Sequence, residues 1–277
     1  MAVERRAWSH DELLVVFRLY CRTPFGRLHQ HNPEIIHLAE LIRRTPGAVA
    51  MKACNLASLD PRQQARSIKA LSNVSRADRD LWNTFMIDSV GVAQEAEVAY
   101  AAVTGKEIED YLPELVYLEE EGGDKRESRK RVFSDKLIVP DGATEKDVIL
   151  KTRRVQSFFR AAVLTSYNSR CALTGLAIPE LLNASHIIPW SVDEKRRADP
   201  RNGICLNAFH DRAFDRGLIA FDENLRVIVS SSISQIEECD IHQNQLVEIS
   251  GRPLRLPERF LPEKEALEYH RKHIYRP

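Results

Sequence analysis

Three short blocks in the C-terminal half of the chain decide how the sequence is interpreted. They read SHIIPW at 185–190, NGICL at 202–206 and HDRAFD at 210–215. Within them His186, Asn202 and His210 follow one another in that order. The spacing leaves room for one strand, a loop, a second strand and the start of a helix.

This order resembles the HNH, or ββα-metal, endonuclease family, most closely its restriction-type branch. The resemblance extends from about residue 156 to residue 229. Flanking residues also carry it: Gln156, Phe159, Arg160, CALTG at 171–175 and FDRG at 214–217. It implies an α+β protein in which an N-terminal helical domain precedes a ββα-metal nuclease domain.

The resemblance assigns a role to each residue of the triplet. Hydrolysis of a phosphodiester needs a base for the attacking water and a cation near the phosphate. His186 is the expected base, because an ordinary histidine with a pKa of about 6.5 is mostly neutral near pH 7. Asn202 is expected to hold the loop by local hydrogen bonds, and His210 is expected to bind the metal.

Two features depart from the family pattern. Many family members place an aspartate or histidine metal ligand directly before the base, where this chain has Ser185. Asp215 is a candidate for the missing carboxylate, although an aspartate there equally suits a turn cap. The expected cofactor is a divalent metal, Mg²⁺ in the first place, with Mn²⁺, Ni²⁺ or Co²⁺ as alternatives. Paired Cys-x-x-Cys motifs are absent, so structural zinc is not expected.

The front of the chain carries three helix starts. Ser9 with Glu12 forms a capping box, and Asn32-Pro33 and Thr45-Pro46 each place a capping residue before a proline. The short connection before the third helix resembles a helix-turn-helix of the Myb-like or homeodomain-like kind. That resemblance predicts contacts with double-stranded DNA, and the alternative is a helical bundle used for dimerisation. The candidate DNA-binding residues are Arg44, Lys52 and Asn55.

Charge is unevenly distributed. The net charge is zero, yet residues 151–217 hold eleven Lys or Arg against six Asp or Glu. The loop between His186 and Asn202 is basic and is expected to contact DNA phosphates, the alternative being a solvated loop without a role. Its candidate residues are Lys195, Arg196, Arg197 and Arg201.

The organisation expected from composition is a helical domain at 1–105, a charged linker at 106–150 with a short strand near 132–139, and a nuclease domain at 151–277. No long apolar run is present in the sequence, no secretory leader is expected, and five cysteines without a pairing pattern suit a reducing compartment. These features predict a cytoplasmic protein without membrane contact.

Together these features predict a metal-dependent HNH endonuclease that cuts DNA, of restriction or defence type and acting as a homodimer, with the front domain selecting the site or a modified base. Two alternatives remain open. One is a non-catalytic DNA-binding regulator that keeps a decayed HNH scaffold, and the other is an HNH nuclease acting on RNA or branched DNA.

Overall fold

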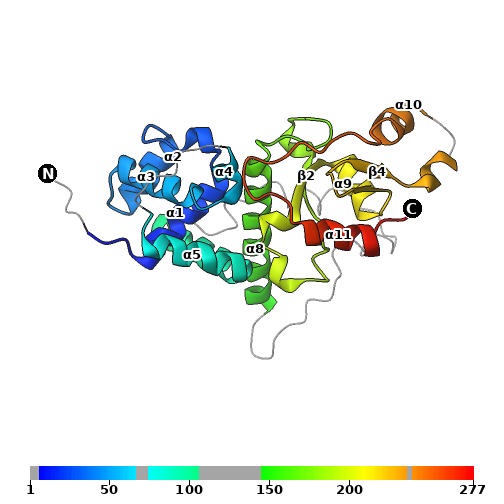
Figure 1. The fold of residues 1–277 in the computed structure, drawn as a ribbon. Coiled ribbons are helices and arrows are strands. Elements are labelled where there is room, and N and C mark those ends of the chain that lie inside the picture. Colours follow the sequence, from blue (N-terminus) through cyan, green and yellow to red (C-terminus); the bar gives the residue numbers. More distant parts are fainter. Residues whose placement is uncertain (1–5, 67–73, 106–144, 236–238) are drawn as a thin grey trace, which may run out of the picture.

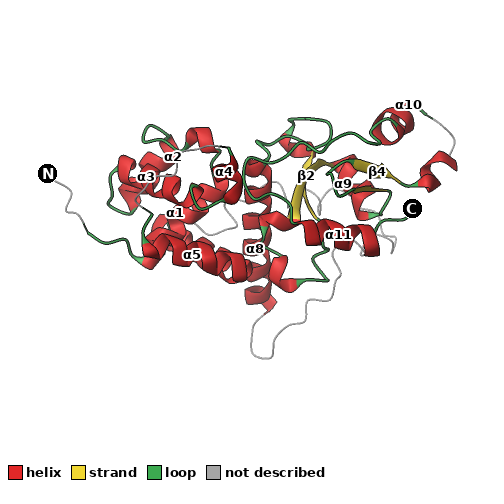
Figure 2. Cartoon of the chain, viewed as in Figure 1, coloured by secondary structure: helices red, strands yellow, loops and turns green. Residues whose placement is uncertain are grey.

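The computed structural model describes residues 6–66, 74–105, 145–235 and 239–277 (Figure 1). The strand expected near 132–139, and most of the expected linker, lie outside these residues. Within them, helices form the N-terminal half and flank two small sheets in the C-terminal half (Figure 2). The observed architecture agrees with an α+β protein.

Three helices in the N-terminal half begin at the capping residues that the sequence predicts. Ser9 completes a capping box, and the side chains of Asn32 and Thr45 each accept a hydrogen bond from a backbone N–H of the first turn. Ser75 completes a second capping box at the start of another helix. The helices are α1 (His10–Arg22), α2 (Pro33–Leu41), α3 (Pro46–Ala57), α4 (Pro61–Ala65), α5 (Arg76–Ile87) and α6 (Ser89–Thr104), with a 3₁₀ turn η1 (Phe25–Arg27).

Helix α8 (Glu145–Ser166) stands between the two halves (Figure 1). One of its faces sends Val155 and Phe158 into the core of the N-terminal helices. The next face sends Phe159 and Val163 into the core of the C-terminal half. Because one helix contributes to both cores, the N-terminal and C-terminal halves of the described structure pack against each other.

The centre of the C-terminal half is a two-stranded ribbon. β1 (Leu182–His186) pairs antiparallel with β2 (Gly203–Asn207), and α9 (Ala208–Asp215) follows β2 directly. The ribbon contacts α8 as well as α9. A Cβ atom on Gly203 would lie 2.4 Å from Cγ2 of Val163, so this close approach to α8 requires glycine.

The remaining elements complete the second core. They are 3₁₀ turns η3 (Pro179–Leu181), η4 (Glu194–Arg196), η5 (Pro200–Asn202) and η6 (Ser231–Gln235), a hairpin of β3 (Ile219–Phe221) and β4 (Val227–Val229), helix α10 (Asp240–His242), a π-helical turn η7 (Gln243–Val247) and helix α11 (Lys264–His273).

The segment before α11 joins the two halves. Phe260 is buried among the aromatic side chains of the N-terminal core, with its ring 5.9 Å from that of Trp82 and stacked on it. Arg259 is fully buried and donates hydrogen bonds to the carbonyl oxygens of Tyr20 and Thr23 at the end of α1. The C-terminal part of the chain is therefore anchored inside the N-terminal core.

Among the residues that the structure describes, no helix has both the length and the apolar character needed to cross a membrane.

Candidate active site

His186 occupies the last position of β1. Its ring stacks on Phe159 of α8 at 3.7 Å and meets Trp190 edge-on at 5.6 Å. Its Nε2 atom lies 3.1 Å from the carbonyl oxygen of Arg197. These contacts fix the plane of the ring and one of its two nitrogens.

The hydrogen bond to Arg197 determines the tautomer of His186. A carbonyl oxygen only accepts, so Nε2 carries the hydrogen and Nδ1 of the neutral ring keeps its lone pair. Burial, together with the positive charge of Arg197, lowers the pKa of His186 to about 4. The imidazole is therefore neutral at pH 7, with Nδ1 able to accept a proton.

Asn202 makes the local hydrogen bonds expected of it. Its Oδ1 accepts from the backbone N–H of Ile188 at 2.8 Å, and its Nδ2 donates to the carbonyl of the same residue at 3.1 Å. The side chain is 1% exposed. Asn202 thereby ties the end of the loop to the residues that follow His186.

His210 lies in the interior, which differs from the position expected of a metal ligand open to a phosphate. It is fully buried, and its Nε2 bonds the carbonyl oxygen of Gln245 at 2.7 Å. Burial alone would raise the pKa of the neighbouring Cys171 thiol, but hydrogen bonds with His210 and Thr174 outweigh burial and lower that pKa to about 6. His210 therefore helps to attach the start of α9 to the protein interior.

The next residue, Asp211, faces β1, where the metal ligand was expected to lie. Its Oδ2 accepts a hydrogen bond of 2.6 Å from Nδ2 of Asn183, and its Oδ1 accepts from the hydroxyl of Ser185. Asn183 and Ser185 share one face of β1, because side chains two positions apart in a strand point the same way. Ser185 on β1 therefore orients a carboxylate of α9.

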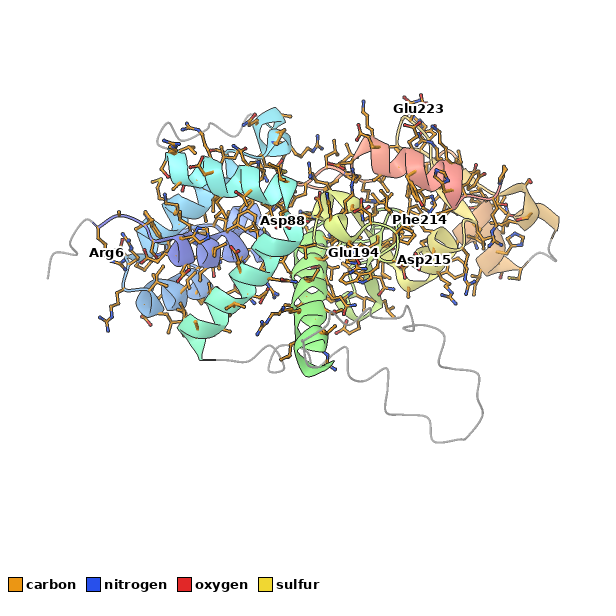
Figure 3. The ribbon with its side chains drawn as sticks, turned by 90° about the horizontal axis from the view of Figure 1, so that it is seen from below. Arg6, Asp88, Glu194, Phe214, Asp215 and Glu223 are labelled. Atoms are coloured by element: carbon orange, nitrogen blue, oxygen red, sulfur yellow. The ribbon has the colours of Figure 1, made fainter. Side chains whose placement is uncertain are left out.

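Asp215 follows Asp211 by four positions, so the two side chains share one face of α9. Figure 3 shows Asp215 on the C-terminal half of the molecule. The residue as a whole is exposed, but protein around its carboxyl and the charge of Asp211 raise its pKa to about 6. A carboxyl whose pKa is raised by burial and by a nearby second carboxylate marks a place where a cation would be stabilised.

The donor set fits a hard divalent cation. Two carboxylates supported by a hydroxyl and an amide are typical of a magnesium site, in which water and substrate phosphate complete the coordination. Within the described part of the chain, no three His, Cys, Asp or Glu side chains are grouped so as to enclose a metal ion. A closed zinc site, which needs four such ligands, does not fit these residues.

The arginines of the loop are engaged within the protein. Arg196 pairs with Glu263 at 2.5 Å, and Arg201 pairs with Asp199 at 2.6 Å and with Glu263 at 2.8 Å. Arg197 pairs with Glu194 at 3.3 Å and stacks over Trp190. Lys195 is exposed, and its ammonium makes no ion pair with any residue that the structure describes.

In the N-terminal half, the structure does not support DNA contacts from the three residues expected to make them. Lys52 is buried and pairs with the fully buried Asp78 at 2.8 Å. Asn55 is 5% exposed. The side chain of Arg44 is 7% exposed, pairs with Glu12 at 2.9 Å and lies over the ring of Trp8. Each of these charges has a partner in the interior, which offsets the cost of burying it.

Residues 171–222 match the model of the HNH endonuclease family. The match covers the ribbon and α9, and it contains His186, Asn202, Asp211 and Asp215. A search of curated proteins gave no match to the chain. The matched segment suggests a nuclease, and nucleases with this domain generally depend on a divalent metal.

Sequence reasoning did not select Asp211, Asn183 or Phe159 for the roles that the structure gives them. The signal for Asp211 was its separation of four positions from Asp215. The stacking of Phe159 on His186 joins residues that are 27 positions apart, and no periodicity in the sequence connects them.

Proposed function

We propose that this chain is a metal-dependent endonuclease that hydrolyses phosphodiester bonds in DNA, with His186 as the general base and Asp211 and Asp215 as the metal ligands. The observation that carries the proposal is the geometry of His186. A hydrogen bond to a backbone carbonyl fixes its tautomer and leaves Nδ1 as the proton acceptor.

The proposed reaction is hydrolysis of a phosphodiester bond by one water molecule. Nδ1 of His186 takes a proton from water, and the water oxygen forms a bond to phosphorus. The bond between phosphorus and the 3′ oxygen breaks, and that oxygen takes up a proton. The products are a 5′-phosphate and a 3′-hydroxyl. The negative phosphate also favours the protonated imidazole, which increases the basicity of His186 when DNA is bound.

The protein supplies orientation for this reaction. Phe159 and the Arg197 carbonyl fix the ring of His186, while Asn183 and Ser185 fix the carboxylate of Asp211. A divalent cation bound there would offset the negative charge that develops on the phosphate and on the departing oxygen. Preorganised groups of this kind lower a reaction barrier because they need no rearrangement during the reaction.

A homodimer and a restriction-type role are part of the proposal. One HNH centre cuts one strand, so a double-strand break most simply needs two copies of the chain. The resemblance to the restriction-type branch supports defence against foreign DNA, in the cytoplasm where such DNA arrives. The choice of DNA site is not assigned to Arg44, Lys52 and Asn55, because all three are engaged in the helical bundle.

The test is a cleavage assay on plasmid and phage DNA, modified and unmodified, with EDTA, Mg²⁺, Mn²⁺, Ni²⁺ or Co²⁺. The wild-type protein is expected to cut when a metal is present, and His186→Ala is expected to lose about 10²- to 10⁴-fold in rate, as for loss of a general base. His10→Ala is the matched control, because that histidine is 66% exposed and lies in the N-terminal half. Equal cutting by both variants would contradict the proposal.

A further inference from the structure

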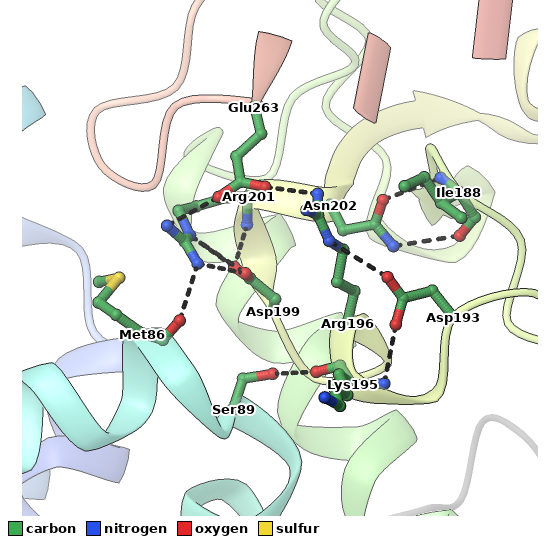
Figure 4. A network of polar contacts seen from close by, with 10 residues as sticks. All are labelled: Met86, Ser89, Ile188, Asp193, Lys195, Arg196, Asp199, Arg201, Asn202 and Glu263. Carbon is green, nitrogen blue, oxygen red and sulfur yellow. Dashed lines mark hydrogen bonds and ion pairs between the residues drawn. The ribbon is translucent and has the colours of Figure 1, made fainter. Parts of the chain in front are cut away.

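Glu263 holds both ends of the basic part of the loop between β1 and β2. Its carboxylate pairs with Arg196 at 2.5 Å and with Arg201 at 2.8 Å, and its backbone N–H donates to the Arg201 carbonyl at 3.0 Å. Figure 4 shows these contacts converging on one glutamate. The side chains are only 21 to 30% exposed, so solvent screens these pairs less than it screens pairs at an open surface.

The loop segment between these two arginines carries the group that orients the base. Arg197 directly follows Arg196, and its carbonyl oxygen accepts the hydrogen from Nε2 of His186. Two further contacts from the N-terminal half fix the loop at the two ends of this segment. Ser89 donates to the Lys195 carbonyl at 3.0 Å, and Arg201 reaches the carbonyl of Met86 (Figure 4).

The backbone next to Glu263 is anchored in the N-terminal core. It is the residue before α11, and it follows Arg259 and Phe260, which are buried in the N-terminal core. Phe260 is further held by a hydrogen bond of 3.0 Å from its N–H to Asp60. The ion pairs of Glu263 therefore connect the loop to the interior of the N-terminal half. That half is distant from the ribbon in sequence.

We infer that Glu263 is a positioning residue for the nuclease reaction: by pairing with Arg196 and Arg201 it holds the Arg197 carbonyl against Nε2 of His186. This inference rests on the proposed function, since it assigns a role at the same site. In this arrangement the N-terminal helices support the loop beside His186.

The charge balance supports a positioning role over a phosphate-binding role for the two arginines. Arg196 and Arg201 face three carboxylates, those of Asp193, Asp199 and Glu263. Their positive charge is therefore compensated within the protein. If the arginines instead left Glu263 to bind phosphate, removal of the glutamate charge would free them and strengthen DNA binding.

The experiment compares Glu263→Gln with Glu265→Gln in the full chain. Glu265 is exposed in the first turn of α11, so its substitution removes the same charge two residues away. Three quantities are measured: kcat for cleavage, Kd for DNA in the presence of EDTA, and the tautomer of His186 from ¹⁵N shifts of labelled histidine. His186→Ala identifies the signal among the nine histidines.

Glu263→Gln is expected to lower kcat by roughly 10- to 100-fold, the scale of a misplacement of about 1 Å at a reacting group. Its Kd for DNA is expected to stay within about twofold of wild type, and its His186 signal is expected to show both tautomers instead of the Nε2–H form alone. Glu265→Gln is expected to match wild type in all three measurements.

Unchanged kcat and an unchanged tautomer in Glu263→Gln would overturn the inference, as would a changed tautomer with full kcat. A tighter Kd would overturn it in favour of phosphate-binding arginines. If the wild-type protein cuts no DNA, the proposed function fails, while the tautomer measurement still decides whether Glu263 positions His186. If Glu263→Gln does not fold, Arg196→Gln removes one of the two ion pairs and is judged by the same outcomes.

Discussion

Nε2 of His186 lies 3.1 Å from the carbonyl oxygen of Arg197, a residue eleven positions further along the chain. The first is at the end of β1 and the second is in the loop that leads to β2. This single contact fixes which ring nitrogen carries hydrogen. The protonation of the His186 ring therefore depends on the conformation of this loop and on the residues that hold the loop in place.

Substitution of Asn202 is expected to affect both rate and stability. In Asn202→Ala the backbone N–H and carbonyl of Ile188 lose their buried partners, at a cost of about 1–3 kcal/mol for each group left unpaired. We expect a lower melting temperature and a kcat reduced at least about tenfold, with DNA affinity unchanged. Steady-state kinetics and a thermal melt measure these effects. Full kcat in the folded variant would remove Asn202 from the positioning network.

Asp211→Asn is expected to weaken binding of Mn²⁺, measured by calorimetry or by electron paramagnetic resonance. The loss is expected to be at least about tenfold, because one of two carboxylates loses its charge. Glu223→Gln removes an exposed carboxylate from the β3–β4 turn and serves as the control. If His210→Gln, when folded, weakens Mn²⁺ binding as much as Asp211→Asn, then His210 takes part in holding the ion.

Lys52→Met is expected to destabilise the fold without changing the way DNA binds. The substitution leaves the carboxylate of Asp78 buried without its cation, which costs about 3–5 kcal/mol. Urea unfolding measures the stability. A lysine that contacts phosphate contributes about one unit to the salt dependence of DNA binding. We expect that dependence to be unchanged in the folded variant, and a decrease of one unit would restore the DNA-contact role.

His270 is expected to make the fold sensitive to acid. It is 2% exposed, stacks on Phe214 at 3.7 Å and bonds the Phe214 carbonyl, and burial lowers its pKa to about 4. The unfolded chain binds a proton near pH 6.5, whereas the folded protein does so only near pH 4. The stability contributed by the neutral ring is therefore complete above pH 6.5 and is lost as the pH falls towards 4.

The variant His270→Phe isolates this effect. It keeps an aromatic ring against Phe214 but has no group to protonate. Between pH 7 and pH 5, wild-type unfolding free energy is expected to fall more steeply, by up to about 1.4 kcal/mol per pH unit for one histidine. Urea titrations at several pH values provide the measurement. Identical pH dependence in both proteins would show that His270 is not the group responsible.

Arg259→Met is expected to loosen the attachment between the two halves. The buried guanidinium of Arg259 satisfies the carbonyls of Tyr20 and Thr23, and methionine leaves both unpaired, at about 1–3 kcal/mol for each group. We expect a lower melting temperature and faster proteolysis. Arg252→Met, at a side chain that is 53% exposed, is the control. Equal stability of the two variants would contradict an anchoring role.

The sequence by itself determined the local elements of this protein. Caps such as Ser9, Asn32 and Thr45 act within one turn of the chain, so their effect is visible in four or five consecutive letters, and the helices begin beside them. The order of His186, Asn202 and His210 likewise determined the order of strand, loop, strand and helix. The hydrogen bonds of Asn202 join nearby backbone, and they follow the expected pattern.

Only the tertiary structure decided which polar side chains face the site. A step of one residue along a helix turns a side chain by about 100°, so whether His210 or Asp211 faces β1 depends on how α9 packs against the ribbon. In the structure His210 is fully buried and Asp211 meets Ser185. Lys52 and Glu263 depend on long-range packing in the same way, because Asp78, Arg196 and Arg201 reach them through contacts between distant segments.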